Sequence, residues 1–341
     1  MEIVFFSEGN QHTRFFEPIL KQFAKQSADI TLITLDREDK LIESKLISNI
    51  KIPKNNFEKI NLLKNISSDY FITTTPGLGQ GYFPKSKVWP SNKRPKYVYL
   101  FHSLVSPNEM YIKNSFNNFD IIFAPSDNIK NQLKYLVTKN VEIIVSGYLL
   151  FDNIKNHQTT KKTSNNILIA PTWGDGGLVN DIPNLEKLIN FFNNKNYNVE
   201  VRPHPMTFKN KKLINQMNNF KLDLTPEVNN FNVYDFLVTD YSGIALEYYF
   251  FTKNPTLFIE STKKIRRKIT KQESNLILIE NEMRNIIGNT VKLNLDEEII
   301  LPKITDISKA NNFINSFHNK ESSLKVIDEF LNKNLGNQKK E

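Results

Sequence analysis

Residues 1–34 read MEIVFFSEGNQHTRFFEPILKQFAKQSADITLIT. Residues 3–6 are apolar, with β-branched and aromatic side chains, and they predict a strand over residues 2–7. Apolar residues then recur at helical spacing over residues 15–26, and residues 29–34 predict a second strand. A strand, a helix and a strand in this order are the βαβ unit of parallel sheets. The opening of the chain therefore predicts an α/β fold.

The same alternation continues along the chain in two series. Further strands are predicted at residues 70–74, 96–101, 121–124 and 141–146, and then at 166–170, 197–202, 236–239 and 256–258. Helices are predicted at residues 184–193, 209–218, 243–251, 310–317 and 324–331. The stretch from Phe151 to Asn166 is polar and lacks a hydrophobic period. We therefore predict two Rossmann-like, doubly wound domains that face a central cleft: residues 1–155, a linker at 156–166, a second domain at 167–318 and a helical tail at 319–341.

The composition is that of a folded protein that favours anionic partners. The 341 residues are 39% hydrophobic and 24% charged, and 45 basic against 36 acidic residues give a formal charge of +9. Such an excess favours nucleotides, phosphopolymers, anionic lipid or nucleic acid. The chain has no cysteine, which excludes disulfides, thiolate metal sites and cysteine nucleophiles and permits a reducing cytoplasm. No apolar run reaches the ~20 residues that cross a bilayer, and the first residues lack the basic region of a signal peptide.

Small polar residues directly follow the predicted strand 236–239, at the sheet edge where doubly wound proteins bind ligands. The segment reads Thr239-Asp240-Tyr241-Ser242-Gly243 and runs into a predicted helix. Main-chain N–H groups and the dipole at the start of that helix would suit a pyrophosphate, with hydroxyl groups of the segment as further donors. The alternative is an ordinary capped turn, with Asp240 or Ser242 as the N-cap residue.

A histidine between two prolines follows the predicted strand 197–202, in the sequence Arg202-Pro203-His204-Pro205. Arginine is a permanently charged, forked phosphate ligand, and histidine can donate to a phosphate or move a proton. The prolines restrict the backbone and so hold the imidazole in one place. The alternative is a structural turn with an exposed imidazole.

A second histidine, His102, follows the predicted strand 96–101 and is next to Ser103. If the two domains face each other, His102 lies on the opposite wall of the cleft from His204, where a general base for a hydroxyl acceptor would be needed. A buried structural histidine is the alternative.

Three further segments end predicted strands and should border the same crevice. Glu8 and Gly9 follow the first strand, and a loop with Gly77 and Gly79 follows residues 70–74, where a plain turn is the alternative. The segment Ala170-Pro171-Thr172-Trp173 opens the second domain and brings a hydroxyl and an aromatic platform to the cleft.

Several familiar motifs are absent. The chain has no G-x-x-x-x-G-K-[ST] phosphate loop, no H-E-x-x-H, no G-x-S-x-G, no zinc-ligand spacing and no D-x-D metal motif. We therefore expect no cofactor and no metal ion, with phosphate charge met by Arg202, His204 and helix-end amides. The densest charge cluster is Lys263-Lys264-Ile265-Arg266-Arg267-Lys268, which is either a solvated face or a contact for an anionic polymer or the inner membrane leaflet. Nucleic acid is not expected, because no nucleic-acid-binding module accompanies this cluster.

Four motifs thus occur in a fixed order: His102 in a Phe-His-Ser context, then residues 170–173, 202–205 and 239–243. Together they resemble the CDP-glycerol glycerophosphotransferases of teichoic acid synthesis. The resemblance implies a GT-B fold, with the nucleotide donor in the C-terminal domain and the acceptor in the N-terminal one. It implies His102 and His204 as catalytic residues, the first as base for the acceptor hydroxyl and the second, with Arg202, at the donor diphosphate. The implied donor-binding residues are Arg202, Thr172, Trp173, Thr239, Asp240, Tyr241, Ser242, Gly243 and Glu247, and the acceptor-side residues are Glu8, Gly9, Gly77, Gly79 and Ser103.

The sequence therefore predicts a transferase that moves glycerol phosphate, or a related polyol phosphate, from a CDP-activated donor to a hydroxyl of a cell-envelope or capsule polymer, releasing CMP. The expected partners are that donor and an anionic polymer or lipid-linked acceptor. The expected location is the cytoplasm, with peripheral contact to the cytoplasmic face of the membrane. Two alternatives stay open: a GT-B glycosyltransferase that uses a nucleotide sugar for capsule or lipopolysaccharide, and an inactive GT-B-like protein that binds a polymer.

Overall fold

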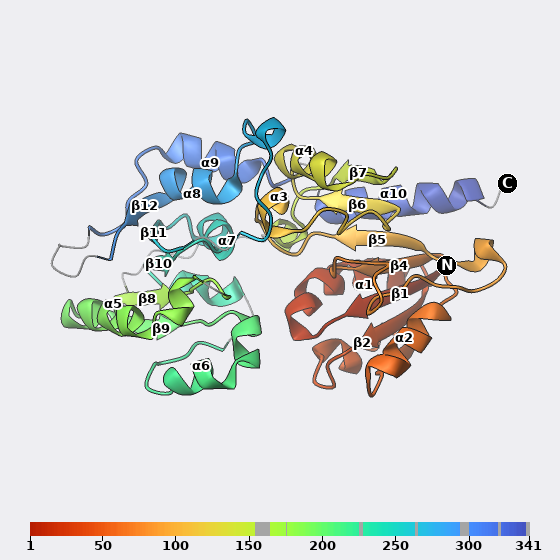
Figure 1. Cartoon of the computed structure of the whole chain (residues 1–341), viewed down its shortest axis with the longest axis horizontal. Coiled ribbons are helices and arrows are strands. Elements are labelled where there is room, and N and C mark those ends of the chain that lie inside the picture. Colours follow the sequence, from red (N-terminus) through yellow and green to blue (C-terminus); the bar gives the residue numbers. More distant parts are fainter. Residues whose placement is uncertain are drawn as a thin grey trace.

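The structure is a computed structural model that describes residues 1–153, 164–174, 176–224, 228–262, 265–293, 300–319 and 322–338. Its strands form two separate parallel sheets, which lie in two halves side by side (Figure 1). The predicted α/β architecture with two doubly wound sheets is thereby confirmed. Most of the predicted linker, residues 156–163 of 156–166, lies outside the described residues, as does Asp175.

The N-terminal half contains a seven-stranded sheet in the order β3-β2-β1-β4-β5-β6-β7. Strands β2 and β3 lie on one side of β1, and β4 to β7 lie on its other side. This switch in strand order places a crevice for ligands at the carboxyl ends of β1 and β4. The strands are β1 (Glu2–Ser7), β2 (Asp29–Thr34), β3 (Asn49–Lys51), β4 (Tyr70–Thr73), β5 (Lys96–Leu100), β6 (Ile121–Ala124) and β7 (Glu142–Val145). The helices of this half are α1 (Thr13–Lys25), α2 (Asn56–Lys64), α3 (Pro107–Met110) and α4 (Asp127–Leu136).

The C-terminal half contains a five-stranded sheet in the order β12-β11-β10-β8-β9. Here β9 lies on one side of β8, and β10 to β12 lie on its other side. The strand order therefore switches between β8 and β10, and this sheet also has a crevice at its carboxyl edge. The strands are β8 (Asn166–Ile169), β9 (Asn198–Val201), β10 (Phe236–Thr239), β11 (Thr256–Ile259) and β12 (Gly288–Val291). The helices that follow β8 in the chain are α5 (Ile182–Asn194), α6 (Lys211–Gln216), α7 (Ile244–Thr252), α8 (Ile279–Ile286), α9 (Ile307–Asn315) and α10 (Ser323–Gln338).

The last helix, α10, returns to the N-terminal half, where it lies beside β6 and β7 (Figure 1). Its side chains Ile327 and Leu331 are buried in the core beneath the first sheet. The Tyr70 hydroxyl of β4 donates to the main-chain carbonyl of Leu331 at 2.9 Å. The chain therefore crosses between the halves twice, and the C-terminal segment contributes to the stability of the N-terminal half.

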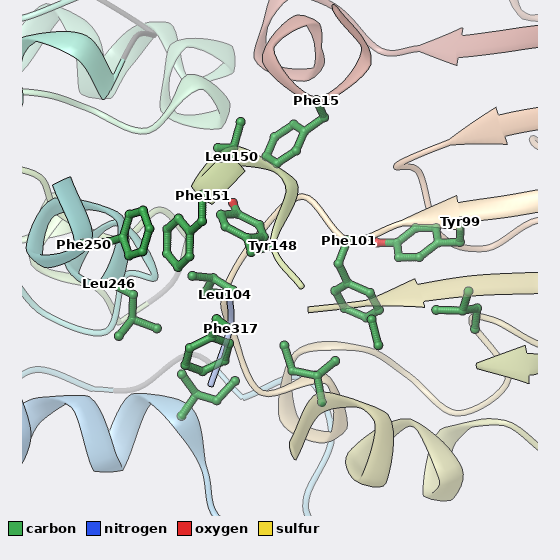
Figure 2. Close-up of a cluster of buried hydrophobic side chains, with 14 of the residues drawn as sticks. Phe15, Tyr99, Phe101, Leu104, Tyr148, Leu150, Phe151, Leu246, Phe250 and Phe317 are labelled. Carbon is green, nitrogen blue, oxygen red and sulfur yellow. The ribbon is translucent and has the colours of Figure 1, made fainter. Parts of the chain in front are cut away.

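A continuous apolar core joins the two halves. Phe151, just before the crossing, stacks on Phe250 of α7 with ring centroids 3.6 Å apart and an interplanar angle of 10°. Figure 2 shows these two rings face to face, with Tyr148 and Leu104 beside them. Burial of aromatic rings at this scale holds the two sheets in one relative position. Within the described ranges, no helix is both long and apolar enough to cross a membrane.

Candidate active site

A cavity of about 450 Å³ lies between the halves, where the carboxyl ends of strands from both sheets meet. The segments after β1, β4 and β5 form one wall, and those after β8, β9 and β10 form the other. Eleven side chains or glycines singled out from the sequence border it: Glu8, His102 and Ser103 from the N-terminal half, and Thr172, Trp173, Arg202, His204, Tyr241, Ser242, Gly243 and Glu247 from the C-terminal half. The structure thus brings both histidines to one opening.

Two predicted donor-binding residues, Thr239 and Asp240, do not border the cavity, because both are fully buried behind it. The Thr239 hydroxyl donates to the carbonyl of Ala170 at 2.6 Å. The Asp240 carboxylate accepts from the main-chain N–H groups of Thr172, at 2.8 Å, and Leu178, at 2.9 Å. Asp240 therefore positions the loop of Thr172 and Trp173 rather than presenting its own oxygens to a ligand.

The three predicted acceptor-side glycines, Gly9, Gly77 and Gly79, also lie outside the lining of the cavity. Each has a positive φ, between 84° and 132°, which side chains disfavour. Gly79 also lies against the Asn118 side chain, with which an added Cβ would clash. These glycines shape the loops after β1 and β4, while other residues of the same loops, among them Glu8 and Pro76, border the cavity.

His102 borders the cavity as a half-buried imidazole. Its Nδ1 is shielded from solvent and has no hydrogen-bond partner among the described residues. Burial, and secondly the charge of Arg14, lower the pKa of His102 to about 4. His102 is therefore neutral at pH 7, and a neutral imidazole keeps one nitrogen lone pair that can accept a proton. This is the protonation state that a general base needs.

A third histidine, His12, lies against His102, with ring centroids 5.5 Å apart in an edge arrangement. Its Nδ1 is hydrogen-bonded to the Thr74 hydroxyl. Burial, then the nearby His102 and Arg14, hold the pKa of His12 well below its usual value. His12 and Arg14 were not singled out from the sequence. Their place in the segment after β1, at the predicted crevice, was the signal available.

Glu247 of α7 faces the cavity but is engaged by the opposite half. Its carboxylate forms a two-point contact with the guanidinium of Arg14 on α1, at 2.9 and 3.3 Å. The Tyr148 hydroxyl donates to the same carboxylate at 2.7 Å. This pair links residues 233 positions apart. Glu247, expected to bind the donor, thus also connects the two halves.

Arg202 and His204 border the cavity after β9 with defined orientations. The Arg202 guanidinium donates to the Asp223 carboxylate through Nε at 3.0 Å and Nη2 at 2.5 Å. His204 Nδ1 accepts from the N–H of Met206 at 3.1 Å, which in a neutral imidazole places the proton on Nε2. The imidazole also stacks on Trp173, with ring centroids 5.6 Å apart. His204 is therefore held as a hydrogen-bond donor.

Gly243, rather than Asp240 or Ser242, is the N-cap residue of α7, and the Ser242 hydroxyl accepts from the N–H of Ile244 in the first turn at 3.4 Å. A Cβ on Gly243 would lie 2.7 Å from the carbonyl oxygen of Leu104. Since φ here is −61°, the glycine is required by this close approach and not by backbone conformation. The start of α7 thus borders the cavity and contacts the N-terminal half.

The basic run 263–268 is not a uniform solvated face. Lys263 and Lys264 lie outside the described residues. The Arg267 guanidinium forms an ion pair with Glu273, and Arg266 lies over the Trp173 ring at 5.6 Å and borders the cavity. In the part of the chain that the structure describes, no three His, Asp or Glu side chains converge as a group that could hold a metal ion.

Comparisons with known proteins agree with this arrangement. A model of the CDP-glycerol:poly(glycerophosphate) glycerophosphotransferase family matches residues 1–267. A solved structure of the wall teichoic acid polymerase TagF with CDPG is similar at 16% identity and a TM-score of 0.60, over 99% of this chain and 89% of that one. A UDP-GlcNAc 2-epimerase from Methanocaldococcus jannaschii, in complex with UDP-GlcNAc and UDP, is similar at 15% identity and a TM-score of 0.55, over 97% and 99%. No curated protein matches the sequence significantly. At such identities the solved structures show the fold, which is the predicted GT-B arrangement.

Proposed function

The chain belongs to the CDP-glycerol:poly(glycerophosphate) glycerophosphotransferase family, and from that premise we propose how its cavity performs the reaction. A transferase of this family moves glycerol phosphate from CDP-glycerol to a polymer hydroxyl and releases CMP. The observation that supports our assignment of the site is that His102 and His204, from different halves, border one cavity.

We propose that His102 is the general base. The acceptor hydroxyl gives its proton to the neutral imidazole of His102 while its oxygen attacks the phosphorus that bears glycerol. A new P–O bond forms, the P–O bond to the cytidylyl phosphate breaks, and CMP leaves with that electron pair. General-base catalysis of this type contributes about 10²–10⁴ in rate. Holding both reactants between two walls supplies a further part, because it removes the entropy cost of bringing them together.

The C-terminal wall is proposed to bind the diphosphate. The Nε2–H of His204, the Arg202 guanidinium and the hydroxyl and main-chain N–H groups at Ser242 and Gly243 are all donors of the kind that phosphate oxygens accept from. Preorganised donors stabilise the charge that develops on the leaving phosphate. Under this proposal residues 1–155 are the acceptor side and residues 167–318 the donor side.

The decisive assay follows the nucleotide product. The full chain is incubated with CDP-glycerol and a glycerol-phosphate-primed acceptor, and release of CMP is measured alongside polymer growth. We expect CMP in step with polymer, and its loss in the His102→Asn variant while CDP-glycerol still binds. A nucleoside diphosphate released from a nucleotide sugar would support the glycosyltransferase alternative instead. Polymer binding without consumption of any donor would support the inactive binding protein.

We also propose that the acceptor is an anionic, wall teichoic acid-like polymer, as in the name of TagF, and that the protein acts in the cytoplasm against the inner leaflet. The charge of +9 supports contact with an anionic surface. Sedimentation with vesicles that contain phosphatidylglycerol tests this. Binding that falls with salt is expected, and no difference from neutral vesicles would contradict it.

A further inference from the structure

Arg266 is held in place by the N-terminal half although it follows β11 in the C-terminal half. Its main-chain N–H donates to the carbonyl of Glu109 in α3 at 2.9 Å. The next residue, Arg267, donates from its N–H to the same carbonyl at 3.2 Å and from Nε to the carbonyl of Asn108 at 2.9 Å. Arg267 also forms an ion pair with Glu273, and this contact further fixes the backbone at Arg266.

The side chain of Arg266 lies against the C-terminal wall of the cavity. Its guanidinium carbon is 5.6 Å from the centre of the Trp173 ring, and Trp173 stacks on His204. The Arg266 guanidinium and the His204 imidazole therefore both contact the same indole on the donor wall. A guanidinium has five N–H donors, and a contact with an aromatic ring leaves them able to form hydrogen bonds.

The charges around the cavity single out Arg266. Three arginines border it: Arg14, Arg202 and Arg266. Arg14 is ion-paired with Glu247 and Arg202 with Asp223. Arg266 has no ion pair with a carboxylate among the residues that the structure describes. A diphosphate brings about two negative charges, and the guanidinium without a carboxylate is the one whose charge is not already balanced.

We propose that Arg266 is a further donor-binding residue, which holds the diphosphate of the nucleotide donor together with Arg202. The proposal rests on the proposed function, since it deepens the assignment of the same cavity. Because its backbone is bound to α3 and its side chain lies on Trp173, Arg266 contacts the diphosphate only when the two halves are correctly placed. A phosphate of the acceptor polymer has the same chemistry, and the test separates the two.

The test is calorimetric titration of the full chain with CDP-glycerol, CMP, cytidine and inorganic pyrophosphate. Loss of a charge-assisted hydrogen bond in Arg266→Gln should weaken CDP-glycerol and pyrophosphate by about tenfold to a hundredfold, CMP by less and cytidine not at all. Arg266→Lys, which keeps the charge without the planar fork, should recover part of the affinity. Lys268→Gln, two positions further on at an exposed site, is the matched control and should bind as the parent does.

Each other outcome is decisive. Unchanged affinity of Arg266→Gln for both CDP-glycerol and pyrophosphate overturns the proposal. Unchanged donor affinity with a raised KM for the acceptor assigns Arg266 to the acceptor phosphate and also overturns it. If the parent protein does not bind CDP-glycerol but binds pyrophosphate in a way that depends on Arg266, Arg266 is supported as a diphosphate ligand and the proposed function is rejected. If the parent protein binds no phosphate compound, the Arg266 proposal and the proposed function are both rejected. Should Arg266→Gln fail to fold, Arg266→Lys provides the same comparison.

Discussion

The carboxylate of Glu247 on α7 forms an ion pair of 2.9 Å with the guanidinium of Arg14 on α1. The two residues belong to different sheets, and the pair lies at the cavity beside His102. Glu247 is almost fully buried, whereas the Arg14 side chain is one-third exposed. Its charge also lowers the pKa of His102. This contact thus holds the two halves together, and its arginine lowers the pKa of the proposed base.

Removing both partners of this pair should destabilise the protein by less than the two single changes together. Glu247→Gln leaves the arginine without its counter-charge, and we expect a loss of about 2 kcal/mol in the free energy of unfolding. Arg14→Met with Glu247→Gln should cost less than the sum of the single changes, because no unpaired charge is then left. Urea unfolding of the four proteins of this cycle measures the coupling. Strict additivity would contradict a direct interaction.

A methyl group at the contact between the halves should disturb donor binding. In Gly243→Ala the new Cβ would lie 2.7 Å from the carbonyl oxygen of Leu104, so the start of α7 has to move. Overpacking of this kind costs about 1–3 kcal/mol, and we expect weaker binding of CDP-glycerol in addition. Gly81→Ala is the control, because that position has open space and no positive φ. Equal behaviour of the two variants in titration and thermal melting would count against the close contact.

Activity should persist well below neutral pH. The pKa of His102, about 4 because of burial and then Arg14, keeps the base neutral down to pH 5. The rate at saturating substrate should therefore fall only as the pH drops toward 4, where the imidazole takes up a proton. A profile of kcat between pH 4 and 8, with circular dichroism to verify folding, measures this. A fall centred on pH 6.5 would mean that the base has an ordinary histidine pKa.

Stability should decrease on mild acidification for the same reason. Burial lowers the folded-state pKa of both His12 and His102 below the ordinary 6.5. The unfolded chain then binds more protons, so the stabilisation is complete above pH 6.5 and is lost as the pH falls toward the folded-state values. Each histidine contributes up to about 1.4 kcal/mol per pH unit within that window. Chemical unfolding at pH 7, 6 and 5 should show this slope, and the double variant His12→Gln with His102→Gln should show less of it.

Much of the fold could be predicted from the periodicity of apolar residues. Strands β1, β2, β6 and β10 coincide with their predicted ranges, since a buried strand of a parallel sheet is a short apolar run. Strand β3 was missed because its three residues at the sheet edge are exposed or half-buried. Strand β12 was missed because it begins with Gly288 and buries none of its four residues fully.

The candidate site could be located from the sequence, but the hydrogen bonds and ion pairs within it could not. Loops after parallel strands converge at one edge whatever their composition, and this placed His102, Arg202, His204 and Ser242 together. The same rule could not show that the Asp240 carboxylate is used by the main chain of the neighbouring loop.

The sequence by itself therefore determined the elements, the two series of strands and the edge at which polar residues gather. These follow from local burial patterns within a few residues of each other. Only the tertiary structure decided that Glu247 meets Arg14, that Gly243 contacts Leu104, and that the main chain of Arg266 bonds to Glu109. Such contacts depend on how one sheet is placed against the other. That placement is set by the packed aromatic core between the halves, which no short-range pattern encodes.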